Sequence, residues 1–164
     1  MLLKIFGYIT TAVTILSLYR FVFVLIGLFS KSKVFPPSDI KKKYGVVISA
    51  RNESAVIGRL LDSIKDQDYD RSYITVFIVA DNCNDNTAQI CRERGAIVYE
   101  RHDSLRARKG YALEYLFGKI DSDYGINNFD CFIFFDADNL LRKNFISEIN
   151  KAMSAGADIC VGYR

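Results

Sequence analysis

The sequence predicts an α/β fold: a mostly parallel sheet with helices on both faces, preceded by an N-terminal transmembrane helix. From Tyr44 onward, short apolar runs alternate with amphipathic helical patterns. These runs are apolar at consecutive positions, which is typical of parallel strands buried on both faces. A long apolar stretch near the N-terminus predicts the separate membrane segment.

The composition indicates a folded domain and argues against some functions. Half of the 164 residues are hydrophobic and a quarter are charged, so the chain can bury a core. The net charge of +3 is uneven: residues 1–44 carry +6 and the remainder −3, so no nucleic-acid-binding face is expected. The four cysteines form no Cys-x-x-Cys pair, which argues against a metal cluster or a disulfide framework.

Residues 1–30 are expected to form a transmembrane anchor. Ile5–Phe29 is a mostly apolar stretch whose only charge is Arg20, and as a helix these 25 residues would span roughly 37 Å, enough to cross a core of about 30 Å. The apolar residues outweigh the insertion cost of Arg20, about 2.5–3.5 kcal/mol. More lysines follow the stretch than precede it, so the positive-inside rule places the rest of the chain in the cytoplasm. An interfacial helix or a signal peptide is the alternative.

Residues 31–44 are expected to form a basic juxtamembrane linker. Pro36 and Pro37 disfavour a helix, and the lysine triplet Lys41–Lys43 suits an anionic lipid surface. The cell membrane is therefore the expected location and an expected partner.

Residues 45–164 are expected to form the α/β domain. Its helices are recognised by apolar residues on one face, with Gly95 and Gly156 placed to end two of them. The predicted strands are Gly45–Ala50, Ile74–Ala80, Ala96–Glu100, Cys131–Phe135 and Ala157–Tyr163. The predicted helices cover residues 56–64, about 86–94, 111–120 and 144–155.

Polar clusters follow the predicted strands, where the ligands of parallel sheets bind. Residues 51–53 follow the first strand, 81–87 the second and 136–139 the fourth, while the basic residues 106–110 precede the third helix. All four clusters are expected to converge on one edge of the sheet. Each also has a structural explanation: residues 52, 53 and 85 can start helices, and the other charges can lie in solvated loops.

Asp136 and Asp138 are the strongest candidates for a metal site. In an extended segment, residues two positions apart share a face, and two carboxylates aimed together repel unless a cation lies between them. Carboxylate oxygens suit Mg²⁺ or Mn²⁺, which typically also bind substrate phosphates, and Lys109 can add a charge to the same phosphates. The chain has no GxxxxGK[ST] or GxGxxG motif, and His102 is its only histidine, with no evident partner.

The motifs VVISARNE, IVADNCNDNT, RKGYAL and FFDADN, in this order, resemble the family 2 inverting glycosyltransferases with a GT-A fold. The resemblance covers about residues 45–164. It departs from the family pattern at Ala80, which stands at the first aspartate of V-D-D-G-S-T, and at residues 82–84, which replace Gly-Ser-Thr.

The resemblance implies a role for each matching residue. Ala50, Arg51 and Glu53 would border the nucleoside pocket, and Asp81 would contact the uracil. Lys109 and Gly110 would line the phosphate side. Asp136, Ala137 and Asp138 would form the DXD motif, in which Asp138 ligates the metal and Asp136 holds the ribose or shares the metal.

The implied function is metal-dependent transfer of a sugar, with inversion, from a nucleotide-sugar donor, typically a UDP-sugar, to a glycan or lipid acceptor. The family's catalytic base lies well downstream of DXD, so it is expected beyond Arg164, and the chain is expected to be the donor-binding half of a larger enzyme. The alternative is a nucleotide-binding or interaction fragment without turnover. A nucleotidyltransferase is a weaker third hypothesis, because Arg51-Asn52-Glu53 is not the glycine-rich basic loop expected of one.

Overall fold

The structure, a computed structural model, describes residues 2–29 and 34–162. The chain divides into two compact units, Met1–Val34 and Phe35–Arg164. Part of the predicted linker, residues 31–33, and the end of the last predicted strand, Tyr163, lie outside the described residues.

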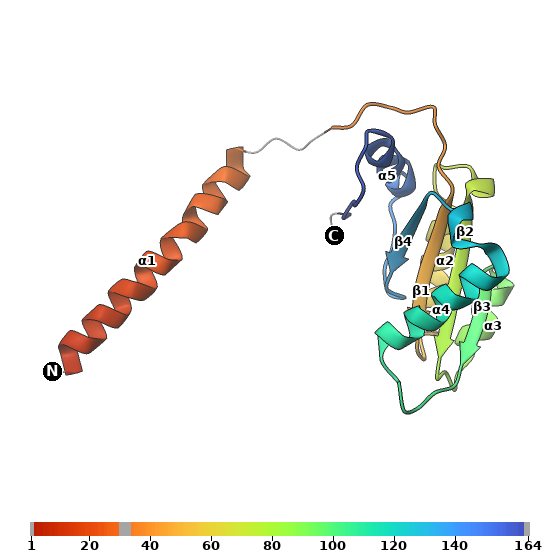
Figure 1. The fold of residues 1–164 in the computed structure, drawn as a ribbon, viewed down its shortest axis with the longest axis horizontal. Helices are drawn as coiled ribbons and strands as arrows, with labels where there is room; N and C mark the ends of the chain where they lie inside the picture. The colour runs from red at the N-terminus through yellow and green to blue at the C-terminus, as the bar shows by residue number, and fades with distance from the viewer. Residues whose placement is uncertain (1, 30–33, 163–164) are drawn as a thin grey trace. The chain divides into compact units, whose positions relative to one another are not determined.

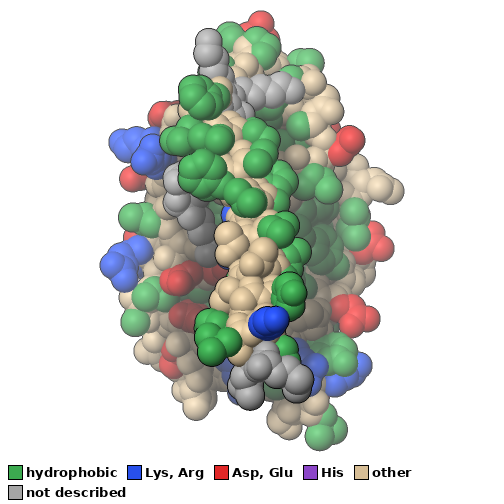
Figure 2. Space-filling model, turned by 90° about the vertical axis from the view of Figure 1, so that its left-hand side faces the viewer, with side chains coloured by type: hydrophobic (Ala, Val, Ile, Leu, Met, Phe, Trp, Pro, Cys, Tyr) green, Lys and Arg blue, Asp and Glu red, His purple; other side chains and the backbone are tan. Residues whose placement is uncertain are grey.

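The first unit contains one helix, α1, from Leu2 to Phe29. Its side chains from Leu3 onward are exposed, and hydrophobic groups follow one another along it (Figure 2). The hydroxyls of Thr11, Thr14 and Ser17 each donate to the carbonyl four residues earlier, at 2.8–2.9 Å, so these three groups find partners within the helix. By length and composition, Leu3–Phe29 can cross a membrane.

The second unit is built on a four-stranded sheet with the order β3-β2-β1-β4, and every neighbouring pair is parallel. The strands are β1 (Tyr44–Ala50), β2 (Ile74–Asp81), β3 (Ile97–Arg101) and β4 (Cys131–Phe135). The central strand β1 is buried at six of its seven residues, as expected of a strand covered on both faces. The predicted parallel α/β fold is confirmed.

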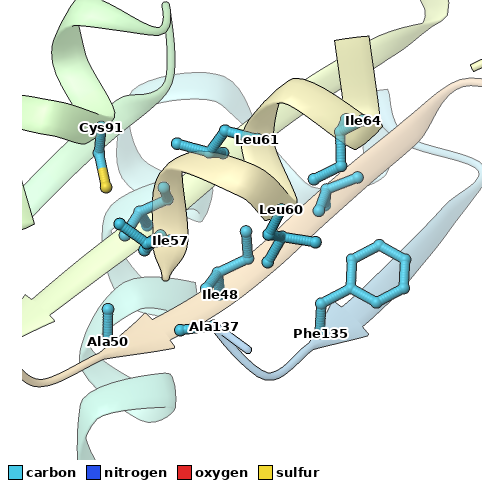
Figure 3. Packing of buried hydrophobic residues seen from close by; sticks show 11 residues of the cluster. Ile48, Ala50, Ile57, Leu60, Leu61, Ile64, Cys91, Phe135 and Ala137 are labelled. Carbon is cyan, nitrogen blue, oxygen red and sulfur yellow. The ribbon is translucent and has the colours of Figure 1, made fainter. Parts of the chain in front are cut away.

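Helices cover both faces of this sheet (Figure 1). On one face, α2 buries Ile57, Leu60, Leu61 and Ile64 against β1 and β4 (Figure 3), whereas Val56, expected on the same face, precedes the helix and is half-buried. Cys91 of α3 and Phe145 of α5 join this cluster, whereas Ala112, Leu116 and Ile120 of α4 pack on the opposite face. The helices are α2 (Ile57–Lys65), α3 (Thr87–Glu93), α4 (Lys109–Tyr124) and α5 (Phe145–Ser154), with short 3₁₀ helices at Arg71–Tyr73 and Ile126–Asn128.

The prediction of a fifth strand at residues 157–163 is wrong for its described part. Residues 157–162 form no strand, and Ile159 and Val161 are 87% and 91% exposed. A strand needs a partner for its backbone donors and acceptors, and no described segment pairs with these residues. The apolar run alone could not reveal this.

The C-terminal part of the predicted linker is docked onto the domain through Asn150, which is buried in α5. Its Nδ2 donates to the Ile40 carbonyl at 2.8 Å, and its Oδ1 accepts from the Lys42 amide at 3.2 Å. The same Oδ1 lies 3.0 Å from the hydroxyls of both Tyr44 and Tyr69. Burial raises the pKa of Tyr69 to about 12, so the hydroxyl keeps its proton at neutral pH. One buried amide thus ties residues 40–44 to α5.

Replacing this amide should destabilise the domain. Asn150→Ala removes one hydrogen-bond partner from each of four polar groups, and we expect the free energy of unfolding to fall by about 2–3 kcal/mol. The measurement is denaturant unfolding of the full chain in detergent, followed by circular dichroism. Asn86→Ala is the matched control, because Asn86 is exposed and its side chain makes no capping hydrogen bond. An equal loss in both variants would contradict the role of Asn150.

Candidate functional site

The candidate site is a pocket of about 410 Å³ at the carboxyl edge of the sheet. Parallel pairing places the ends of β1, β2 and β4 at this edge, and the loops that follow them supply most of the lining. Of the nine residues predicted for the site, seven line the pocket, whereas Ala50 is buried in β1 and Gly110 lies exposed in α4. The lining residues are Ser49, Arg51, Glu53, Asp81, Ala107, Lys109, Asp136, Ala137 and Asp138.

The loops after β1 and β2 are joined by side-chain hydrogen bonds. Asn52 has a left-handed backbone (φ 57°), and its Oδ1 accepts from the Asn84 amide at 2.9 Å. The Glu53 amide donates to Oγ1 of the buried Thr87 at 2.9 Å. These contacts fix the backbone of residues 51–53. They therefore fix the positions from which the side chains of Arg51 and Glu53 extend into the pocket.

Asp85 acts as a helix cap, one of the roles that its position suggested. Its Oδ1 accepts from the Thr87 hydroxyl at 2.6 Å and from the Thr87 amide at 3.0 Å. Its Oδ2 accepts from the Ser54 amide at 3.2 Å, across to the first loop. The hydrogen bond from the Thr87 hydroxyl is the main cause that lowers the pKa of Asp85 to about 2. Asp85 is absent from the pocket lining.

Asp81 lines the pocket but is anchored from behind by Arg101, a residue that the sequence did not single out. Arg101 Nη1 donates to Asp81 Oδ1 at 2.5 Å, and both side chains are less than a tenth exposed. Arg101 ends β3 and pairs in register with Asp81. Because the prediction ended this strand at Glu100, it missed the pair; Ser49 and Ala107 were also missed, since neither carries a distinctive functional group.

The DXD segment is a turn, which corrects the expected extended geometry. β4 ends at Phe135, and the Asn139 amide donates to the Asp136 carbonyl at 3.1 Å, closing a turn. The Asn139 side chain stabilises it, since its Oδ1 accepts from the Asp136 amide at 3.1 Å. Asp136 and Asp138 both line the pocket nevertheless.

Lys109 at the start of α4 forms an ion pair with Asp136 at the end of β4. The two side chains are 56% and 45% exposed, so water reaches both partners. The pair joins a residue predicted for the phosphate side to a residue of the DXD motif.

The pocket chemistry fits a divalent cation that a ligand helps to hold. Its lining contains four carboxylates and two basic side chains, an excess of negative charge. Within residues 2–29 and 34–162, no group of three or more His, Cys, Asp or Glu side chains could hold a metal ion by itself. Mg²⁺ is usually bound by only one or two carboxylates together with substrate phosphates and water. Asp136 and Asp138 can supply these carboxylates.

This domain has a parallel sheet with charged side chains gathered beyond its carboxyl edge. These features place it in the class of α/β domains that bind a ligand at that edge. The chain belongs to glycosyl transferase family 2, since the sequence model of this family matches residues 45–164. No curated protein sequence matches the chain.

Solved structures share this fold over part of their length. A mannosyltransferase, PcManGT from Pyrobaculum calidifontis, in complex with GDP-Man and Mn²⁺, is 21% identical with a TM-score of 0.67, over 87% of this chain and 41% of that one. Mycobacterium tuberculosis glucosyl-3-phosphoglycerate synthase is 21% identical with a TM-score of 0.54, over 77% and 48%. S. aureus TarS (residues 1–349) is 21% identical with a TM-score of 0.52, over 69% and 32%. The GT-A fold is thus confirmed, and this chain spans less than half of each relative.

The hydrogen bond from the Thr87 hydroxyl leads to a prediction about the pKa of Asp85. Thr87→Val removes the hydroxyl donor, so we expect the Asp85 pKa to rise from about 2 toward its ordinary value of 3.8. A folded pKa below the ordinary one stabilises the protein above about pH 4, and this contribution is lost as the pH falls toward 2. The variant should therefore lose less stability over this interval.

The measurement is an NMR titration of the Asp85 carboxyl carbon, with unfolding followed between pH 4 and 2. Thr75→Val is the control, because the hydroxyl of Thr75 is remote from Asp85, near the start of β2. An Asp85 pKa that stays near 2 in Thr87→Val would show that the hydroxyl is not its cause.

Proposed function

We propose that residues 45–164 are the donor-binding half of a membrane-anchored glycosyltransferase that moves a sugar from a UDP-sugar to a glycan or lipid acceptor, with inversion. The observation that carries this proposal is one pocket lined by Asp81, Lys109, Asp136 and Asp138, in a chain of glycosyl transferase family 2. The PcManGT structure holds a nucleotide sugar and Mn²⁺, which supports a donor of this class.

The pocket residues divide into two groups under this proposal. Arg51, Glu53 and Asp81, which follow β1 and β2, face the nucleoside, and Ala50 supports this wall from within the strand. Lys109, Asp136, Ala137 and Asp138 face the diphosphate, and Gly110 follows Lys109 in the first turn of α4. The two groups lie beyond adjacent strands, so one extended ligand can reach both.

Asp138 and Asp136 are the proposed ligands of Mg²⁺ or Mn²⁺. When bound, the cation neutralises charge on the departing diphosphate. Lys109 contributes a positive charge to the same phosphates while it stays within reach of Asp136. Asp138 is exposed, and its Oδ1 accepts only a 3.3 Å hydrogen bond from its neighbour Asn139 among the described residues, so its remaining acceptor sites face solvent or a ligand.

Within residues 2–29 and 34–162, Asp158 is the one aspartate after Asp138 that could act as a base on the acceptor side. Inversion requires a base that takes a proton from the acceptor hydroxyl as it attacks the anomeric carbon. Asp158, the only aspartate after Asp138, is exposed outside any strand or helix and does not line the pocket. The proposal therefore gives residues 45–164 the role of holding the donor.

Donor binding can be tested directly at the DXD motif. We expect calorimetric titration with UDP and Mn²⁺ to show binding by the natural chain and a loss of at least roughly tenfold in Asp138→Ala, because a carboxylate ligand is removed. Asp158→Ala should bind like the natural chain, since Asp158 lies outside the pocket. Equal affinity in all three proteins would refute the metal assignment, and no binding by the natural chain would refute the proposed function.

The membrane orientation follows from the lysines after α1. We expect Asp39→Cys to be labelled by a membrane-impermeant maleimide only after cells are permeabilised, because the positive-inside rule places residue 39 in the cytoplasm. Lys4→Cys, before the helix, should be labelled in intact cells. The reverse pattern would overturn the orientation, and labelling of both in intact cells would overturn the span.

A further inference from the structure

We propose that Arg101 is a positioning residue for base recognition, which holds Asp81 so that one oxygen of its carboxylate is presented to the nucleotide base. This inference rests on the proposed function and assigns a role to a residue outside the pocket lining. The ligand feature that it would select is a ring N–H group, as in the imide edge of uracil.

Arg101 is held from several directions at once. It is 7% exposed and ends β3, directly beside Asp81 at the end of β2. Its Nη1 donates to Asp81 Oδ1 at 2.5 Å, while Nη2 donates to Asp103 Oδ2 at 3.0 Å and to the Arg106 carbonyl at 3.1 Å. A planar guanidinium bound at both of its terminal nitrogens has one orientation, which a lysine ammonium could not reproduce.

The carboxylate of Asp81 is satisfied on one side only. Oδ1 accepts from Arg101 and, at 3.1 Å, from Asn82 Nδ2. Within the described residues no hydrogen bond reaches Oδ2, although Asp81 lines the pocket. A buried carboxylate needs partners for its remaining lone pairs. The arrangement therefore leaves one acceptor for a ligand.

The paired charge also determines what this acceptor can recognise. A carboxylate that accepts from a guanidinium offers acceptor oxygens to its other partners, and an ionised carboxylate has no hydrogen to donate. The ring nitrogen N3 of uracil carries a hydrogen and suits this acceptor, whereas N3 of cytosine presents a lone pair and is repelled. The preference for uracil over cytosine should thus depend on Arg101 as well as on Asp81.

Variants of Asp103 can distinguish the positioning of Asp81 by Arg101 from a merely structural role of Arg101 in the loop that leads to Lys109. Asp103 binds Arg101 and also accepts from the Arg106 amide at 3.0 Å, so it orders the loop that leads to Ala107 and Lys109. Loss of Asp103 should disturb this loop while leaving the contact between Arg101 and Asp81. Loss of Arg101 should remove the contact to Asp81, while Asp103 still orders the loop through the Arg106 amide.

The experiment is calorimetric titration of the full chain in detergent, with UDP, CDP and inorganic pyrophosphate, each with saturating Mn²⁺. In Arg101→Met we expect UDP affinity to fall by roughly tenfold or more and the preference for UDP over CDP to approach one. Pyrophosphate affinity should stay within about twofold, because the diphosphate end of the pocket keeps Lys109 and Asp138. Arg101→Lys should restore part of the preference, since it returns the charge but not the two-point hydrogen bonding.

Three further variants make the result specific. Asp103→Ala should keep the preference for UDP over CDP. Arg94→Met should change nothing, because Arg94 forms an ion pair with Asp62 on the surface. The double variant Asp81→Asn with Arg101→Met should bind UDP no more weakly than Asp81→Asn alone, since Arg101 acts through Asp81.

The possible failures are distinguishable. If the natural chain binds UDP but Arg101→Met keeps the base preference, or loses pyrophosphate affinity in parallel, the inference is wrong while the proposed function stands. If the natural chain binds no UDP, both are overturned. If Arg101→Met shows no cooperative unfolding transition, Arg101→Lys decides: a reduced preference supports the inference, and an unchanged one overturns it.

Discussion

The in-register parallel pairing of β1 with both β2 and β4 is the constraint on which the site depends. Tyr44 lies opposite Ile74 on one side and Cys131 on the other, so the three strands begin at one level and run to the same edge. The strands end within a few residues of one another, since β4 ends opposite Ile48 and β2 ends one residue beyond the partner of Ala50. Charged residues that are far apart in the sequence are brought together there because apolar residues buried on both faces fix the register.

The edge is stiffened by two asparagines that follow β1 and β2. Asn52 and Asn82 have left-handed backbones, with φ of 57° and 52°, and each uses its side chain to reach the next loop. Asn52 accepts from the Asn84 amide at 2.9 Å, and Asn82 Oδ1 accepts from the Asp103 amide at 2.9 Å. Asparagine tolerates this conformation and offers both a donor and an acceptor, so each turn fixes its neighbour as well as itself. Three successive loops thus form one connected wall.

Local sequence patterns predicted the strands and the residues that follow them. They missed the features that depend on hydrogen bonds from particular side chains. The strands and the convergence of Asp81, Lys109 and Asp136 followed from apolar runs and their order along the chain. The DXD turn was missed because the Asn139 side chain, rather than the strand, sets its geometry. Arg101 was missed because its contact with Asp81 depends on the register between β2 and β3, which the sequence alone does not give.

Asp81 and Asp136, which lie at the ends of the strands on either side of β1, are paired in physically different ways. Asp81 and Arg101 are 6% and 8% exposed in their side chains, and removing one partner of such a buried pair costs about 3–5 kcal/mol. Asp136 and Lys109 are about half exposed, where an ion pair contributes roughly 0–1 kcal/mol. Under the proposed function, Asp81 would therefore keep its partner while the donor binds, whereas Asp136 would exchange Lys109 for a cation at little cost, and Lys109 would then contact a phosphate. The proposed site thus combines a buried ion pair, which holds the Asp81 carboxylate in one orientation to recognise a ligand, with an exposed ion pair, whose partners can be exchanged for a cation and a phosphate.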